Sequence, residues 1–179
     1  MLSRTAATEL LKIARNAIIH QVNNEVYRPE TKNEKALSIH SGCFVTITRN
    51  GHLRGCIGNF QSQQPLFREV ATMAVAAASQ DPRFPPMSPD ELDNFSLEIT
   101  ILSPLKKIDN TNQIEVGTHG IYIIKEFNRG VLLPQVATEH GWDRETFLRQ
   151  TCVKAGLPEN SWQLAETEIY IFSGQIIHE

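Results

Sequence analysis

Residues 43–58, CFVTITRNGHLRGCIG, hold the pattern that decides the fold. The short β-branched run before Asn50-Gly51 indicates a strand. Asn50 and Gly51 both tolerate the positive φ that a two-residue hairpin turn requires. The segment therefore predicts an antiparallel hairpin, with Cys56 near the end of its second strand.

Helices and further strands are expected on both sides of this hairpin. Apolar residues at helical spacing predict an amphipathic helix over residues 4–22. A second helix is expected to begin at Pro65, and its alanine-rich end suits close packing against a sheet. The chain then shows a capping box at Ser88–Glu91, a strand over 95–104, a hairpin with strands 120–126 and 130–133, a helix capped by Asp143, and a last strand.

This order of elements predicts the fold class. Hairpin, helix and strand follow one another over residues 43–103 and again over roughly 120–173, which suggests an internal quasi-repeat. Hairpins dominate, and there is no alternation of strands with crossover helices. We therefore expect an α+β fold, with a mainly antiparallel sheet and helices packed on it.

Composition narrows the classes of function. The net charge of −3, without a basic block, disfavours nucleic acid as a partner. No run of about 18 apolar residues is present, so we expect no membrane span. The three cysteines are odd in number and widely spaced, which fits a reducing, cytoplasmic location. Metal-ligand spacings and the common nucleotide-binding motifs are absent, so no metal or cofactor is expected.

Cys56 is the first candidate for chemistry. A nucleophilic or redox cysteine needs a stabilised thiolate. Arg54 alternates with it along the strand, so both side chains could share one face. Gly55 and Gly58 could leave backbone N–H groups open to an anion. The alternative is a small core residue beside a bulge, since free cysteine is often buried. Cys43 and Cys152 are expected in the core.

Other polar residues could complete a site. Asp81 and Arg83 lie in a proline-stiffened loop, where Arg83 either presents its charge to a ligand or pairs locally with Asp81. Glu98 lies in a strand and could face solvent or pair with Arg54 or Arg83. His119, in GTHG, is the best candidate for a general base, and its alternative is a turn histidine bonded to backbone.

Several motifs, in this order, resemble those of the AMMECR-type domain family, also called AmmeMemoRadiSam system protein A in prokaryotes. They cover roughly residues 40–172, and LRGCIG followed by DPRFPP is the most specific pair. The resemblance implies one domain over residues 1–179 with a larger and a smaller lobe, in which LRGCIG lines a cleft. The motifs are GCFVTITRNGHLRGCIG, DPRFPPMSPDEL, LEITILSP, GTHGIYI, GVLLPQVATEHGW and FLRQTCVKAGLP.

The family resemblance supplies no established reaction, and three hypotheses about function stay open. The first is an enzyme or enzyme subunit for a small anionic substrate, with Cys56, Glu98 and His119 catalytic. Arg54, Gly55, Gly58, Asp81 and Arg83 would then bind the substrate. The second is a non-catalytic adaptor for a Memo-like or radical-SAM partner. The chain lacks the CxxxCxxC motif of radical-SAM clusters. A third, disfavoured by spacing, is metal or cluster binding through Cys56 and histidines.

Overall fold

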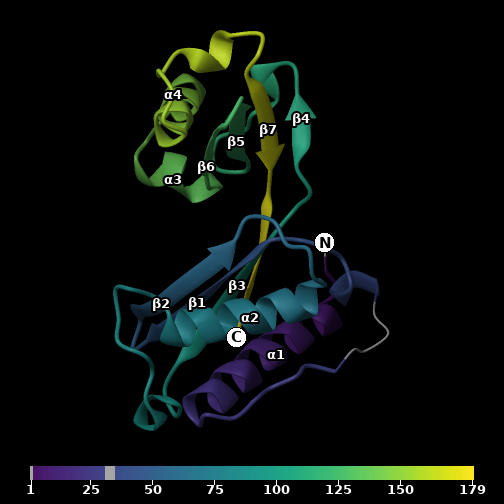
Figure 1. Cartoon of the computed structure of the whole chain (residues 1–179), viewed down its shortest axis with the longest axis vertical. Coiled ribbons are helices and arrows are strands. Elements are labelled where there is room, and N and C mark those ends of the chain that lie inside the picture. The colour runs from purple at the N-terminus through teal and green to yellow at the C-terminus, as the bar shows by residue number, and fades with distance from the viewer. Residues whose placement is uncertain (1, 31–34) are drawn as a thin grey trace. The chain divides into compact units, whose positions relative to one another are not determined.

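The computed structural model describes residues 2–30 and 35–179, which form two compact units (Figure 1). The first unit contains the described residues up to Leu102 together with Gln175–Glu179. The second contains Ser103–Gly174. None of the helices in these described ranges has the length and apolar character that a transmembrane span requires.

The first unit is built on a four-stranded sheet with strand order β2-β1-β3-β8. Helices α1 and α2 lie side by side on one face of this sheet (Figure 1). The predicted helix over 4–22 is confirmed, whereas Pro65 is the cap of α2 and not its first residue. The elements are α1 Arg4–Val22, η1 Lys35–Leu37, β1 Cys43–Arg49, β2 His52–Asn59, α2 Leu66–Ser79, η2 Pro89–Glu91, β3 Ser96–Leu102 and β8 Gly174–His178.

Alternation along the strands gives this sheet an inner and an outer face. Val45, Ile47 and Ile99 point toward the helices and are fully buried. A second set of residues, which includes Thr46 and Glu98, alternates with these along the strands and is at least partly exposed. We call this second set the outer face, meaning the face away from α1 and α2.

The second unit holds another four-stranded sheet, with order β4-β7-β5-β6. Phe147, Leu148 and Cys152 of its longer helix pack on the isoleucines of β5, and Asp143 caps that helix as predicted. The elements are β4 Lys106–Ile108, η3 Thr111–Gln113, β5 Gly120–Lys125, β6 Asn128–Leu132, α3 Pro134–Glu139, α4 Arg144–Lys154, η4 Ser161–Gln163 and β7 Glu168–Phe172.

The α+β class with antiparallel sheets is confirmed. Each sheet also places the second strand of its hairpin at an edge, next to the first strand. The second unit nevertheless has two helices, α3 and α4, where the first has α2 alone between hairpin and strand. The internal quasi-repeat therefore stays a prediction.

Candidate functional site

The two glycines that bracket Cys56 are explained by packing. A Cβ built on Gly55 would lie 2.1 Å from the carbonyl oxygen of Ala77, so only glycine lets α2 approach β2 this closely. A Cβ built on Gly58 would lie 2.3 Å from the ring of Phe44, its partner across the hairpin. Both positions shape the site by allowing close approach.

Cys56 differs from the other two cysteines in its surroundings. Cys43 and Cys152 are fully buried, as expected, and burial raises the pKa of each thiol. Cys56 is partly exposed on the outer face. Its sulfur accepts a hydrogen bond from the hydroxyl of Thr46 at 3.3 Å. Cys56 is therefore not a core residue, and its sulfur has a polar neighbour.

The DPRF loop, residues 81–84, forms hydrogen bonds with the backbone of Cys56 at the edge of the sheet. The buried Asp81 carboxylate accepts the Cys56 N–H at 2.8 Å, and Arg83 Nη2 donates to the Cys56 carbonyl at 3.3 Å. Asp81 also accepts from Arg83 Nε at 2.9 Å and Nη2 at 2.7 Å. This local pair is one of the two predicted readings. Together the two side chains satisfy the backbone N–H and carbonyl of Cys56 on the edge strand, as a neighbouring strand would.

The same contacts favour the charged forms of Asp81 and Arg83. Hydrogen bonds from the Arg83 side chain, and then from the backbone of Cys56, hold the pKa of Asp81 well below its usual range. The Asp81 hydrogen bond raises the pKa of Arg83, and the Cys56 side chain acts in the same direction. The Arg83 side chain is still 54% exposed. A guanidinium beside Cys56 is thus fixed in place and open to solvent.

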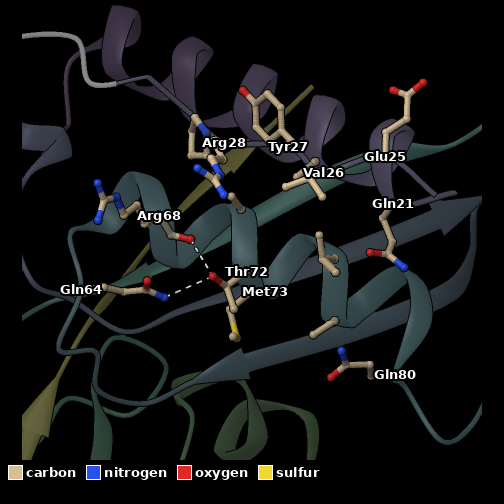
Figure 2. A pocket seen from close by; sticks show the side chains of 15 residues that line it. Gln21, Glu25, Val26, Tyr27, Arg28, Gln64, Arg68, Thr72, Met73 and Gln80 are labelled. Carbon is tan, nitrogen blue, oxygen red and sulfur yellow. Dashed lines mark hydrogen bonds between the residues drawn. The ribbon is translucent and has the colours of Figure 1, made fainter. Parts of the chain in front are cut away.

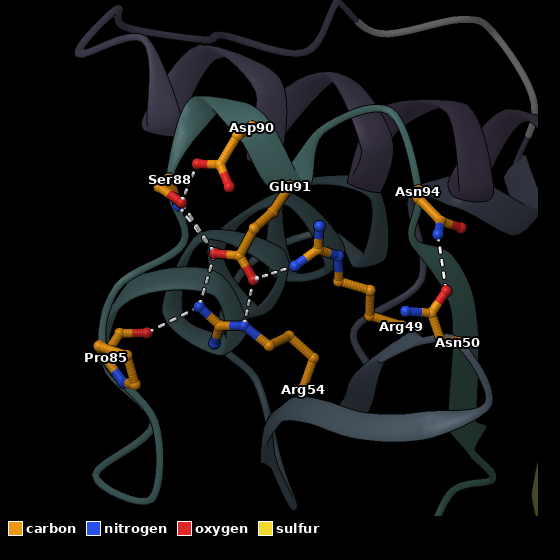
Figure 3. A network of polar contacts seen from close by, with 8 residues as sticks. All are labelled: Arg49, Asn50, Arg54, Pro85, Ser88, Asp90, Glu91 and Asn94. Atoms are coloured by element: carbon orange, nitrogen blue, oxygen red, sulfur yellow. Dashed lines mark hydrogen bonds and ion pairs between the residues drawn. The ribbon is translucent and has the colours of Figure 1, made fainter.

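Arg54 is bound to a different carboxylate. It is the extra residue of a bulge, because Ile47 pairs with Gly55 while Thr48 pairs with Leu53. Its guanidinium donates to both oxygens of Glu91, at 2.7 and 2.9 Å, as Figure 3 shows. The bulge interrupts the alternation from which a shared face with Cys56 was expected. Arg54 ties β2 to η2.

Glu91 was not predicted as a partner, although the capping box that contains it was. Its carboxylate accepts the N–H of Ser88 at 3.0 Å, which completes the box, and lies 3.6 Å from Arg49 (Figure 3). The Arg54 hydrogen bonds, opposed by burial, lower the pKa of Glu91 to about 2. The Arg54–Glu91 pair therefore stabilises the loop that follows DPRF.

A row of polar side chains crosses the outer face. Thr46 on β1 pairs with Cys56 on β2 and with Glu98 on β3. Glu98 Oε2 lies 3.4 Å from Nδ1 of His178 on β8. Neighbouring strands are about 4.8 Å apart, so Cys56 and Glu98 are roughly 10 Å apart across Thr46. We call Cys56, Thr46, Glu98 and His178 the outer row.

Sequence reasoning missed two members of the outer row. Thr46 could have been found from hairpin register, which places it opposite Cys56. His178 carries no signal, because its place beside Glu98 depends on a strand at the far end of the chain. Of the two alternatives for Glu98, pairing with Arg54 or Arg83 is not seen, and the side chain is 38% exposed and contacts His178.

His119 lies in the second unit, whereas Cys56 and Glu98 lie in the first. Its Nδ1 accepts the backbone N–H of Glu115 at 3.1 Å, which is the turn contact given as the alternative to a general base. Within residues 2–30 and 35–179, no three His, Cys, Asp or Glu side chains are grouped as a metal ion would require.

Comparisons with known proteins place the chain in a family. The model of the AMMECR1 family matches residues 11–177. A protein of Methanothermobacter thermautotrophicus is 42% identical, over 99% of this chain and 96% of its own length. Protein NEQ441 of Nanoarchaeum equitans is 40% identical over 95% of this chain and 98% of its own length.

A solved structure agrees with this assignment. The crystal structure of PH0010 from Pyrococcus horikoshii, an uncharacterized protein, is similar with a TM-score of 0.84 and 35% identity. The match covers 99% of this chain and 93% of that one. With a family model that spans most of its length, the chain belongs to the AMMECR1 family.

Proposed function

We propose that the outer face of the first unit is an enzyme site for a small anionic substrate, with Cys56 as the nucleophile. The observation that carries this proposal is the hydrogen bond from Thr46 to the Cys56 sulfur. A donor aimed at sulfur stabilises the charge of a thiolate, which is the reactive form. A buried packing cysteine needs no such donor.

Arg83 is the group that would hold the anion. Its guanidinium is fixed by Asp81, so little side-chain entropy is lost on binding. More than half of the side chain is exposed, and the planar head suits a carboxylate or phosphate. Asp81 binds and orients Arg83 and does not contact the substrate. Arg54 and the two glycines are assigned structural roles in this site.

Glu98 and His178, at the far end of the outer row, would supply the proton that the leaving group needs. Glu98 and His178 are too far from Cys56 to take its proton directly, since they lie two and three strand spacings from it. A substrate lying across Thr46 would reach both ends. The thiolate, having lost its proton to water, forms an S–C bond with an electrophilic carbon. The bond to the leaving group breaks, and that group takes a proton from the Glu98–His178 pair through one bridging water, since the leaving atom is bonded to the carbon that the sulfur attacks.

Charge-selective alkylation tests this proposal. Iodoacetate is anionic and iodoacetamide is neutral, but both alkylate thiolates. We expect the rate ratio of iodoacetate to iodoacetamide at Cys56 to fall about three- to ten-fold in Arg83→Gln. Arg83→Lys, which keeps the charge, should retain most of the ratio, and Arg4→Gln should leave it unchanged. An unchanged ratio in Arg83→Gln would remove Arg83 as the anion-binding group.

An adaptor role on the same face is the second candidate. Leu53 on β2 and Ile176 on β8 are 42% and 51% exposed, and alternation places both on the outer face. They lie on the two edge strands of the sheet, so an adaptor's partner would contact them at opposite margins of this face. The partner would be a Memo-like or radical-SAM protein, in a cytoplasm that keeps the thiols reduced. Retention of either purified partner, lost in Leu53→Lys but kept in Cys56→Ser, would favour the adaptor over the enzyme.

A further inference from the structure

A cavity of about 680 Å³ lies in the first unit, between α2 and the segment that follows α1 (Figure 2). This volume is within the range of sites for small molecules. Its walls combine apolar side chains, amides and two arginines. The apolar part includes Ala17, Val26, Ala71, Met73, Val75 and Ala76.

One end of the cavity is cationic. Arg28 and Arg68 lie at that end together with Gln64 and Thr72 (Figure 2). Both arginines are exposed, and in the described part of the chain neither forms an ion pair with a carboxylate. Arg54 and Arg83, by contrast, are each held by an acidic side chain. Within the described residues no carboxylate neutralises either guanidinium group, and Arg68 also lies 5.6 Å from the ring centroid of Phe67.

Hydrogen bonds to the buried Glu69 hold the wall of the cavity beside these arginines in place. Gln64 Nε2 donates to Glu69 at 2.7 Å and to Thr72 at 3.2 Å, so both amide hydrogens are used within the wall. Glu69 is 2% exposed and also accepts from Asn59 and Ser62. A wall held in this way costs little ordering entropy when a ligand binds.

The other end of the cavity is polar without being cationic. Gln21, Glu25 and Gln80 line that end, and Figure 2 shows them away from Arg28 and Arg68. Met73 and Ala76 contribute apolar surface from α2. The cavity thus suits an elongated molecule with a negative head, an apolar middle and a hydrogen-bonding tail.

We propose that this cavity is a second binding site, separate from Cys56, for a small organic anion. The carboxylate or phosphate head would lie between Arg28 and Arg68. The body would rest on Met73 and Ala76, and a hydrogen-bonding group at the other end would reach the amide of Gln21 or Gln80. The site lies on the helical side of the sheet, whereas Cys56 lies on the outer face, so binding here does not depend on the proposed thiol chemistry.

Amide NMR titration of the whole chain tests the site. The probes are AMP for a phosphate head, glutarate for a carboxylate head, and inorganic phosphate as a head without a body. We expect AMP or glutarate to shift the amide signals of Gln64, Thr72 and Met73 at millimolar concentration or below. Which of the two binds identifies the head group. Inorganic phosphate should bind more weakly, because it cannot use the apolar wall.

Variants assign the binding to the two arginines. The double variant Arg28→Ala/Arg68→Ala should bind the probe about ten-fold more weakly or worse. The matched control Arg4→Ala should keep the affinity of the wild type. Cys56→Ser should bind as the wild type does, which separates this site from the proposed enzyme site. The proposal is overturned if neither organic anion shifts these signals at ~10 mM. It is equally overturned if the double variant binds like the wild type, or if inorganic phosphate binds as tightly as AMP or glutarate.

Discussion

The buried carboxylate of Asp81 accepts the backbone N–H of Cys56 at 2.8 Å, which joins the DPRF loop to the LRGCIG strand. The two most specific motifs of the sequence are thus parts of one structure. Arg83 closes the contact by donating to Asp81 and to the Cys56 carbonyl. The loop therefore fixes the strand on which the thiol lies.

Asp81→Asn should destabilise the first unit. The change removes a buried charge that accepts four hydrogen bonds, from Cys56 and from Arg83. A loss of roughly 2 kcal/mol in the free energy of unfolding is expected from charge-assisted bonds of this kind. Urea unfolding measures it, with the exposed Asp93→Asn as control. Equal stability of the two variants would mean that the loop is held by other contacts.

Stability should also fall at acidic pH because of Glu91. Its folded pKa is about 2, below the ordinary value of 4.5, so its ionised form stabilises the fold above pH 4.5. That contribution is lost as pH falls from 4.5 toward 2. We expect roughly 1–2 kcal/mol over this range, measured by urea unfolding at pH 6 and pH 3. Compared with the wild type, Glu91→Gln should be less stable at pH 6 and should lose less stability between pH 6 and pH 3.

Glycine substitutions should separate packing from backbone strain. Gly55→Ala places a methyl group against the Ala77 carbonyl and should cost about 3 kcal/mol, because α2 must move. Gly51→Ala meets no atom within 4 Å but keeps a φ of +78°, so about 1 kcal/mol is expected. Thermal unfolding of both variants ranks them. A Gly55→Ala protein as stable as Gly51→Ala would show that the helix does not limit this position.

Thr46→Val should slow the alkylation of Cys56. The change removes the hydroxyl that donates to sulfur while keeping the shape of the side chain. A loss of one hydrogen bond to a charged acceptor predicts a rate about three- to ten-fold lower. Thr48→Val, on the same strand and face, is the matched control. Rates that are equal in both variants would show that Thr46 does not activate the thiol.

Local sequence signals predicted the elements well. Asn50 and Gly51 have φ of 52° and 78°, which are the positive angles that the hairpin turn requires. The capping box at Ser88 and the Asp143 cap are also confirmed. Each of these depends on residues within one turn of chain, so propensity and capping chemistry decide them without tertiary information.

The candidate site was less predictable because it depends on long-range register. The bulge at Arg54 follows from how β2 pairs with β1, and it directs the guanidinium to Glu91. The contact between Glu98 and His178, which are 80 positions apart in the chain, needs β3 and β8 to be neighbours. Neither pairing leaves a periodic signal that a single sequence would show.

Site-resolved alkylation of the native protein shows whether Cys56 is a reactive thiol. Iodoacetamide at neutral pH, followed by peptide mass spectrometry, gives a separate rate for each of the three cysteines. We expect Cys56 to react at least ~100-fold faster than the buried Cys43 and Cys152, because those two react only after local opening. Three similar rates, all slow until the protein is unfolded, would mean that Cys56 is a packing residue and not a nucleophile.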